Sequence, residues 1–140
     1  MCLSCYAQIL GGLDYLHKER HAIHRDIKPS NICLNRAGQA KLTDFGVAAE
    51  LHDSAGHCET FVGTFCYMSP ERISGQGYNF NSDVWSFGLC LMECALGRFP
   101  YPSVSVYFEM VQAIVNDAPP LPDAQVFSPQ FCDFIAAWCV

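Results

Sequence analysis

The longest apolar stretch of this 140-residue chain, VWSFGLCLMECALG at residues 84–97, sets the main limit on its fold. The stretch contains an acidic residue and is shorter than the roughly 18 residues that a membrane-spanning helix needs. Asn81 or Ser82 can cap a helix here, and Gly97 is a stop signal at its end. We therefore expect a large central helix at about 82–96 and no membrane span.

Further elements are expected on both sides of this helix. Apolar periodicity and turn signals predict a helix over 3–16, a β-hairpin of ICLN and KLT around the turn Asn35–Gly38, a helix at about 104–116, and a helix that starts at the Ser128–Pro129 cap pair and continues to Val140. Two adjacent glycines, Gly11 and Gly12, weaken the first helix but permit close packing. The stretch 44–71 has few periodic positions and is interpreted as a long loop. The predicted fold class is mainly α, with one small hairpin.

The composition narrows the classes of function. A net charge of −6 and a pI near 5.1 argue against a nucleic-acid-binding surface. The first ten residues lack the basic segment and cleavage site of a signal peptide. Nine cysteines are present, but the C-x-x-C of Cys2 and Cys5 has no second pair at zinc spacing. We expect reduced cysteines that act mostly as small apolar residues, which favours a cytoplasmic location and leaves access to the nucleus open.

Polar and charged side chains gather in HAIHRDIKPSNICLN, residues 21–35, although only 16% of the chain is charged. A turn rich in Pro, Ser and Asn is one interpretation, and a catalytic loop is the other. The segment contains HRD at 24–26 and, after four residues, Asn31. DFG follows the second expected strand at 44–46, and SPE ends the long loop at 69–71. This order and spacing resembles the eukaryotic protein kinase family over essentially the whole chain.

The resemblance implies the C-terminal lobe of a kinase: a partial kinase domain over 1–140, with the catalytic loop at 22–34 and the activation segment at 44–71. The sequence contains no G-x-G-x-x-G loop and no V-A-I-K lysine, so the N-terminal β-lobe is expected to be absent. Two functions therefore stay open. One is a kinase, and the other is a truncated, catalytically inactive fragment that acts only as a binding module. A bare 140-residue chain is expected to bind ATP poorly.

The resemblance also implies ATP and Mg²⁺ as cofactors, with a role for each motif residue. Asp26 would orient the attacking hydroxyl and accept its proton, and Lys28 would meet the transferring phosphate. Asn31 and Asp44 would supply oxygen ligands to Mg²⁺. Cys33 lies where relatives place an apolar residue beneath the adenine ring, and a core thiol is the alternative reading of it.

A second set of residues resembles supporting residues of the family. Arg25 corresponds to the arginine that holds an activation-loop phosphate, with a local salt bridge as the alternative. Asp83 corresponds to the aspartate that anchors the catalytic-loop backbone, with a first-turn helix acid as the alternative. Thr64 matches a threonine that touches the catalytic loop, and Glu71 matches a glutamate whose arginine partner this sequence lacks. The remaining structural members of the motifs are His24, Phe45 and Gly46.

Two segments point to one kinase family. TFVGTFCYMSPERI at 60–73 and GRFPYP at 97–102 resemble the mitogen-activated protein kinase kinases, which phosphorylate a Thr and a Tyr of a downstream kinase. Ser54 and Thr60 have five residues between them, which resembles the activating phosphosites of plant and protist members; solvated loop hydroxyls are the alternative. The implied partners are a downstream mitogen-activated protein kinase and an upstream activating kinase, with no nucleic acid.

Overall fold

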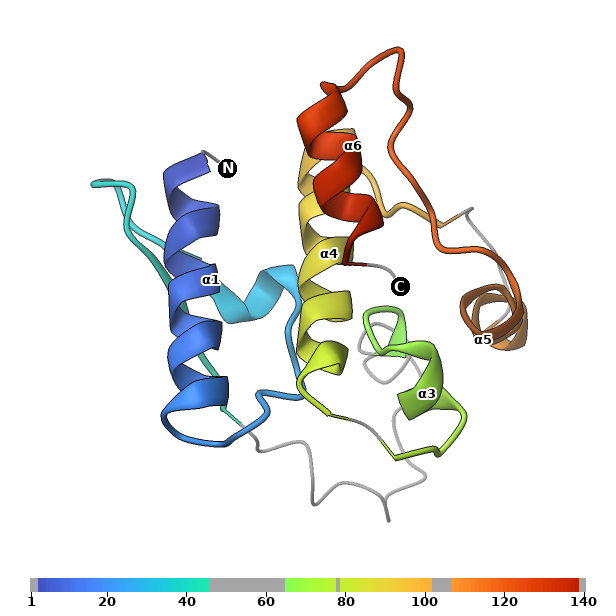
Figure 1. Cartoon of the computed structure of the whole chain (residues 1–140), viewed down its shortest axis with the longest axis horizontal. Coiled ribbons are helices and arrows are strands. Elements are labelled where there is room, and N and C mark those ends of the chain that lie inside the picture. Colours follow the sequence, from blue (N-terminus) through green and yellow to red (C-terminus); the bar gives the residue numbers. More distant parts are fainter. Residues whose placement is uncertain (1–2, 46–64, 78, 102–106, 139–140) are drawn as a thin grey trace.

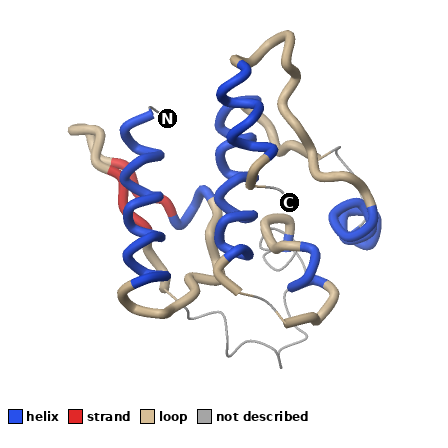
Figure 2. Tube along the Cα trace, in the orientation of Figure 1, coloured by secondary structure: helices blue, strands red, loops and turns tan. Residues whose placement is uncertain are grey.

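The computed structural model describes residues 3–45, 65–77, 79–101 and 107–138 (Figure 1). Its elements in chain order are the helix α1 (Leu3–Lys18), the 3₁₀ turn η1 (Pro29–Asn31), the strands β1 (Ile32–Leu34) and β2 (Ala40–Leu42), and the helices α3 (Pro70–Ile73), α4 (Asn81–Leu96), α5 (Tyr107–Asn116) and α6 (Pro129–Ala136). Figure 2 shows helices along the whole length of the trace and, in its described part, strands only in the hairpin beside α1. The predicted fold class, mainly α with one small hairpin, is confirmed.

Helix α4 forms the centre of the molecule, and Figure 1 shows it between α1 and α5. Residues on every face of its middle turns are buried, and Phe87, Leu89 and Cys90 have no exposed surface. A helix that is apolar on all sides must be covered on all sides, because each exposed apolar face would lose its hydrophobic stabilisation. Three other helices contribute buried residues to the same core, namely Ile9 and Leu13 of α1, Ile114 of α5 and Ile135 of α6.

The cap prediction for α4 is correct at its C-terminal end and wrong at its N-terminal end. The C-terminal end is as predicted: Gly97 adopts a left-handed φ of 69° and its N–H donates to the Glu93 carbonyl. The predicted cap at Asn81 or Ser82 is wrong, because Asn81 is the first helical residue and Phe80 stands at the cap position without a side-chain cap bond. The Asn81 N–H is instead accepted by Asn79 Oδ1 at 2.8 Å. Ser82 is buried and its hydroxyl bonds to side chains outside the helix.

The hairpin packs against α1. Its strands are antiparallel, with Ile32 opposite Leu42 and Leu34 opposite Ala40. Asn35 Oδ1 accepts two backbone N–H groups of the turn, and Gly38 has a φ of 75°. Gln8 of α1 joins the hairpin to the helix, because its side chain accepts the Ala40 N–H at 2.9 Å and donates to the Gly38 carbonyl at 3.1 Å.

Several predicted boundaries are corrected. Helix α1 continues to Lys18, and α6 ends at Ala136 instead of Val140. The last turn of α6 tightens there, since the Trp138 N–H donates to the Ile135 carbonyl while the Trp138 ring packs on Phe134 at 4.5 Å. The predicted long loop ends in the short helix α3, and its residues 46–64 lie outside the described part.

Two predictions about small residues are also corrected. Gly11 and Gly12 are exposed, and a Cβ built on either would meet no atom within 4 Å, so they do not serve close packing. The cysteines in the described residues are free, as expected, but only Cys5 and Cys90 are buried. Cys33 and Cys94 are exposed and therefore do not act as core residues. None of the described helices has the length and apolar character needed to cross a membrane.

Candidate active site

The loop that leads into β1 holds Asp26, Lys28 and Asn31 in direct contact. Asn31 Nδ2 donates to the Asp26 carbonyl at 2.8 Å and to Asp26 Oδ2 at 2.9 Å. Lys28 Nζ lies 2.9 Å from the same Oδ2. Between them, Ile27 is buried in the core, and Pro29 begins the 3₁₀ turn that directs Asn31 back toward Asp26. The carboxylate of Asp26 is thus fixed in orientation and paired with a cation.

The backbone just before Asp26 is held by Asp83 of α4. Asp83 Oδ2 accepts the His24 N–H at 2.8 Å, and Oδ1 accepts the Arg25 N–H at 2.9 Å. His17, at the end of α1, places Nε2 at 2.7 Å from Oδ2 of the same carboxylate. Asp83 is only 1% exposed, so these donors replace the water that a buried carboxylate would otherwise lack.

Asp44 lies next to this loop through the residues on each side of it. Thr43 donates its backbone N–H to the Asn31 carbonyl at 3.0 Å. The Phe45 ring lies 4.8 Å from the His24 ring, although Phe45 is 58% exposed. The hairpin end and this ring contact therefore bring the DFG segment to the HRD segment. Gly46 lies outside the described residues.

The oxygens of Asn31 and Asp44 suit a hard cation. Because Asn31 Nδ2 is directed at Asp26, its Oδ1 is left as an acceptor with one long contact, 3.5 Å from the Ser30 hydroxyl. The Asp44 carboxylate is exposed, and among the described residues its hydrogen-bond contact is with Thr43 Oγ1 at 3.5 Å. Within the described ranges no three His, Cys, Asp or Glu side chains form a metal cage. An amide and a carboxylate fit Mg²⁺, which is usually held by one or two protein oxygens together with substrate phosphates.

The end of the activation segment is tied to both α4 and the catalytic loop. Glu71 Oε1 accepts the Ser82 hydroxyl at 2.8 Å, and the buried Ser69 hydroxyl lies 3.1 Å from that of Ser82. Arg72 Nη1 donates to the Arg25 carbonyl. These bonds connect α3 to residues that precede Asp26. The predicted phosphosites Ser54 and Thr60, and also Thr64, lie outside the described residues.

The comparison with known proteins decides the family. The protein kinase domain model matches residues 2–140. The chain belongs to the protein kinase family. Its helices and hairpin are those of a kinase C-terminal lobe, as the sequence predicted.

Curated relatives place the kinase chain close to the mitogen-activated protein kinase kinases. It is 53% identical over 140 residues to mitogen-activated protein kinase kinase SIPKK of Nicotiana tabacum. This match covers 95% of the chain and 39% of the relative. It is 50% identical over 135 residues to mitogen-activated protein kinase kinase 1c of Physcomitrium patens, and this match covers 92% of the chain and 39% of the relative. It is 57% identical over 96 residues to dual specificity mitogen-activated protein kinase kinase 1 of Dictyostelium discoideum, and this match covers 69% of the chain and 14% of the relative. The kinase chain spans about two fifths of the length of the first two relatives.

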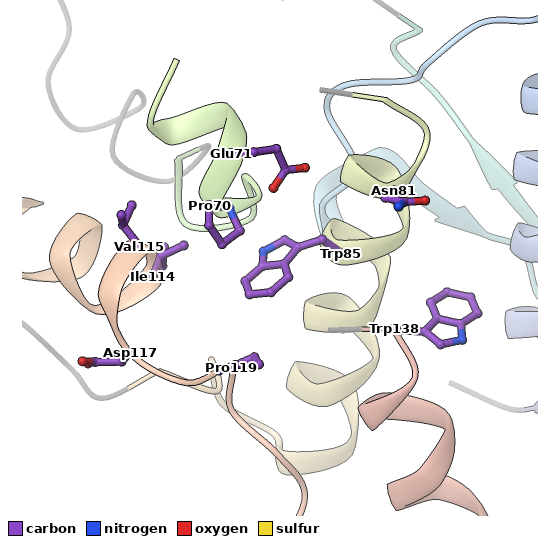
Figure 3. A pocket seen from close by; sticks show the side chains of 9 residues that line it. All are labelled: Pro70, Glu71, Asn81, Trp85, Ile114, Val115, Asp117, Pro119 and Trp138. Carbon is purple, nitrogen blue, oxygen red and sulfur yellow. The ribbon is translucent and has the colours of Figure 1, made fainter. Parts of the chain in front are cut away.

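Two pockets of the kinase chain lie beside this site and do not contain Asp26. Figure 3 shows the first, where Glu71 of α3, Trp85 of α4 and Ile114 of α5 face a common space. The second lies between α1 and β2 and is bordered by Phe45. The catalytic-loop residues line neither of these two pockets, and the Asp26 and Lys28 side chains are 15% and 22% exposed.

Three contact residues were not among the predicted site residues, namely His17, Arg72 and Ser82. Arg72 was within reach of sequence reasoning, because it directly follows the SPE segment. His17 and Ser82 carried no such signal, since a helical histidine and a helix-start serine have many ordinary roles. Cys33, predicted beneath the adenine, is exposed on β1, so the alternative of a core thiol is wrong.

Proposed function

We propose that the kinase of this chain transfers the γ-phosphate of ATP to Ser or Thr and Tyr side chains of a downstream mitogen-activated protein kinase. The observation that supports this most is the contact of Asp26 with both Asn31 and Lys28. A kinase catalytic loop needs a carboxylate that orients the hydroxyl, an oxygen ligand for Mg²⁺ and a cation for the phosphate. The names of the relatives support the choice of substrate class.

In this proposal Asp26 accepts the hydroxyl proton. The Asn31 amide and the Lys28 ammonium both contact Oδ2. These contacts between described residues leave Oδ1 of Asp26 for the incoming hydroxyl. Lys28 is held beside it, where its charge offsets the charge of the phosphoryl group in transit. Mg²⁺, held by Asn31 and Asp44 together with the ATP phosphates, supplies charge neutralisation when bound.

Regulation by phosphorylation of Ser54 and Thr60 is part of the same proposal. Each phosphate adds a charge of about −1.5 to −2 that Arg25 can pair with, because Arg25 precedes Asp26 in the catalytic loop. Replacing both residues with Asp should raise activity toward the downstream kinase if carboxylate charges suffice. If the double Ala variant is activated normally by the upstream kinase, this regulatory assignment is wrong.

The second candidate function is a binding module without catalysis. In the 140 residues given, none of the lysines Lys18, Lys28 and Lys41 stands in a V-A-I-K segment. Kinase catalysis requires that strand lysine, paired with a helix glutamate, in addition to the Mg²⁺-binding aspartate. A binding module would still recognise the downstream kinase.

Phosphate transfer from radiolabelled ATP to a kinase-inactive mitogen-activated protein kinase separates the two functions. The assay compares the 140-residue chain, a form extended with upstream coding sequence, and the extended form with Asp26→Asn. We expect transfer by the extended form, reduced about 10²- to 10⁴-fold by Asp26→Asn, because the general base is lost. Transfer by the 140-residue chain itself would contradict the binding-module function, and no transfer by either form would contradict the kinase proposal.

A further inference from the structure

The residue before Asp26 has a strained backbone. Arg25 adopts a φ of 73°, which places a non-glycine residue in the left-handed region. Such a conformation persists only where the surroundings hold it. Because Arg25 and Asp26 share a peptide, rotation of Arg25 toward a relaxed φ would carry the Asp26 carboxylate away from its contacts. The groups that hold the Arg25 backbone therefore control the position of Asp26.

The N–H side of Arg25 is held by a pair of buried or half-buried side chains. Asp83 accepts the Arg25 N–H at 2.9 Å, and His17 Nε2 lies 2.7 Å from the other oxygen of that carboxylate. The His17 ring is also stacked on Phe80 at 4.7 Å, which limits its rotation. With both oxygens bonded, the carboxylate cannot turn away from the backbone without losing a partner in a site where water is excluded.

The C=O side of Arg25 is held from a different element. Arg72 of α3 donates Nη1 to the Arg25 carbonyl. Its neighbour Glu71 accepts the Ser82 hydroxyl at 2.8 Å, so α3 is itself fastened to the start of α4. The peptide groups on both sides of Arg25 are thus bonded to side chains from separate parts of the chain. His17 lies at the end of α1, and Arg72 lies at the end of the activation segment.

We propose that Arg72 is a positioning residue for Asp26, acting on the carbonyl side of the Arg25 backbone, opposite the bonded pair of Asp83 and His17. The inference rests on the proposed function only in giving Asp26 a catalytic role. In the part of the chain that the structure describes, no hydrogen bond or ion pair joins Asp26 to the side chain of Arg72 or His17. The arrangement makes the placement of Asp26 depend on the conformation of α3, because Arg72 moves with that helix.

Amide hydrogen exchange, measured by NMR on the 140-residue chain, tests the backbone contacts without needing activity. His17→Phe keeps a ring against Phe80 but removes the donor to Asp83, whereas His17→Gln keeps a donor at a similar reach. We expect exchange of the His24 and Arg25 amides to become about tenfold faster in His17→Phe and to stay near the original rate in His17→Gln. Arg72→Met should accelerate the Arg25 amide similarly. Arg98→Met is the matched control, because Arg98 is exposed.

Kinetics of the extended form test the consequence for catalysis. We expect His17→Phe and Arg72→Met to lower kcat about tenfold with little change in the KM for ATP, and His17→Gln to restore kcat. Unchanged exchange of the Arg25 amide in Arg72→Met would overturn the proposal, and so would faster exchange spread equally over all helices in that variant, which indicates a merely structural role. If the unaltered extended form is inactive, the proposed function fails, and the local exchange pattern alone decides whether this clamp on Arg25 exists.

Discussion

Two of the three described non-glycine residues with a positive φ lie where the chemistry is proposed, and the third is His21. Arg25 and Asp44 have φ values of 73° and 61°, and each stands at or beside a residue expected to act on the phosphate. A non-glycine residue in this region costs about 1–3 kcal/mol. The bonds of Asp83 and Arg72 to the Arg25 backbone offset that cost at the first position. The Thr43 contacts with Asn31 restrain the chain just before the second.

The cysteines differ sharply in their surroundings. Burial raises the pKa of the Cys90 thiol well above its ordinary value of 9.0, and the nearby Cys94 and Glu93 add to the shift. Burial likewise raises the pKa of Cys66. Cys33 and Cys94 are exposed. Because thiolate is the reactive form of cysteine, access and pKa together should separate these residues chemically.

Alkylation by iodoacetamide at about pH 8 should therefore be selective. Among the cysteines that the structure describes, we expect Cys33 and Cys94 to be modified first, with Cys5 and Cys90 more than about tenfold slower in the folded chain, as followed by peptide mass spectrometry. The control is the same reaction in strong denaturant, where the cysteines should react at similar rates. Early modification of Cys90 in the folded chain would contradict the burial of that thiol.

At the scale of elements, the glycines of the helices have opposite roles. Gly11 lies exposed inside α1 with open space around the position of a Cβ. Gly97 ends α4 with a φ of 69°, a conformation that side chains with a Cβ disfavour. The same substitution should thus have opposite effects at the two positions.

Gly11→Ala should raise the free energy of unfolding by about 1 kcal/mol, because alanine loses less backbone entropy than glycine in a helix. Gly97→Ala should lower it by about 1–2 kcal/mol, because alanine is strained at a left-handed φ. Urea unfolding followed by circular dichroism measures both. A stability loss in Gly11→Ala would indicate that a close contact at this position exists after all.

The first turn of α4 supplies a second test at this scale. If Ser82 were a helix cap, Ser82→Ala would only loosen the helix start. Because its hydroxyl bonds to Glu71 in a buried setting, Ser82→Ala should instead cost about 1–3 kcal/mol and expose α3. Urea unfolding gives the stability, and proteolysis near residues 69–76 reports the loosening of α3. Ser74→Ala, at an exposed position, is the matched control.

For the molecule as a whole, the core around α4 contains groups that resist ionisation. Tyr67 is half-buried and donates its hydroxyl to Glu93 of α4. Burial, followed by this hydrogen bond, raises the pKa of Tyr67 above its ordinary value of 10.0. The raised pKa of Cys90 adds a second such group in the same region. Both groups keep their protons in the folded state at pH values where an unfolded chain has released them.

The free energy of unfolding should consequently fall as the pH rises above about 9, since the folded state then binds more protons than the unfolded state. Below that pH both states are protonated at these groups, so their contribution is fully present. Urea unfolding between about pH 8 and pH 11 measures the slope. In the double variant Tyr67→Phe, Cys90→Ala the slope should be smaller, and an unchanged slope would contradict this assignment.

Local signals in the sequence predicted much of this kinase. The HRD, DFG and SPE segments, the hairpin turn at Asn35–Gly38 and the stop at Gly97 each depend on residues within a few positions of one another. Their preferences for turns, caps and burial act over the same short distance, so they can be recognised before the chain is folded. The mainly α fold class follows from them.

Contacts between residues far apart in the sequence could be identified only from the tertiary structure. Asp83 meets His17 and His24 across 66 and 59 positions, and Arg72 meets Arg25 across 47. Such partners are chosen by how α1, α3 and α4 pack, which no local preference encodes. The same packing turned the Ser82 hydroxyl from a possible helix cap into a bond with Glu71, because a side chain buried between two elements takes its partner from the neighbouring one.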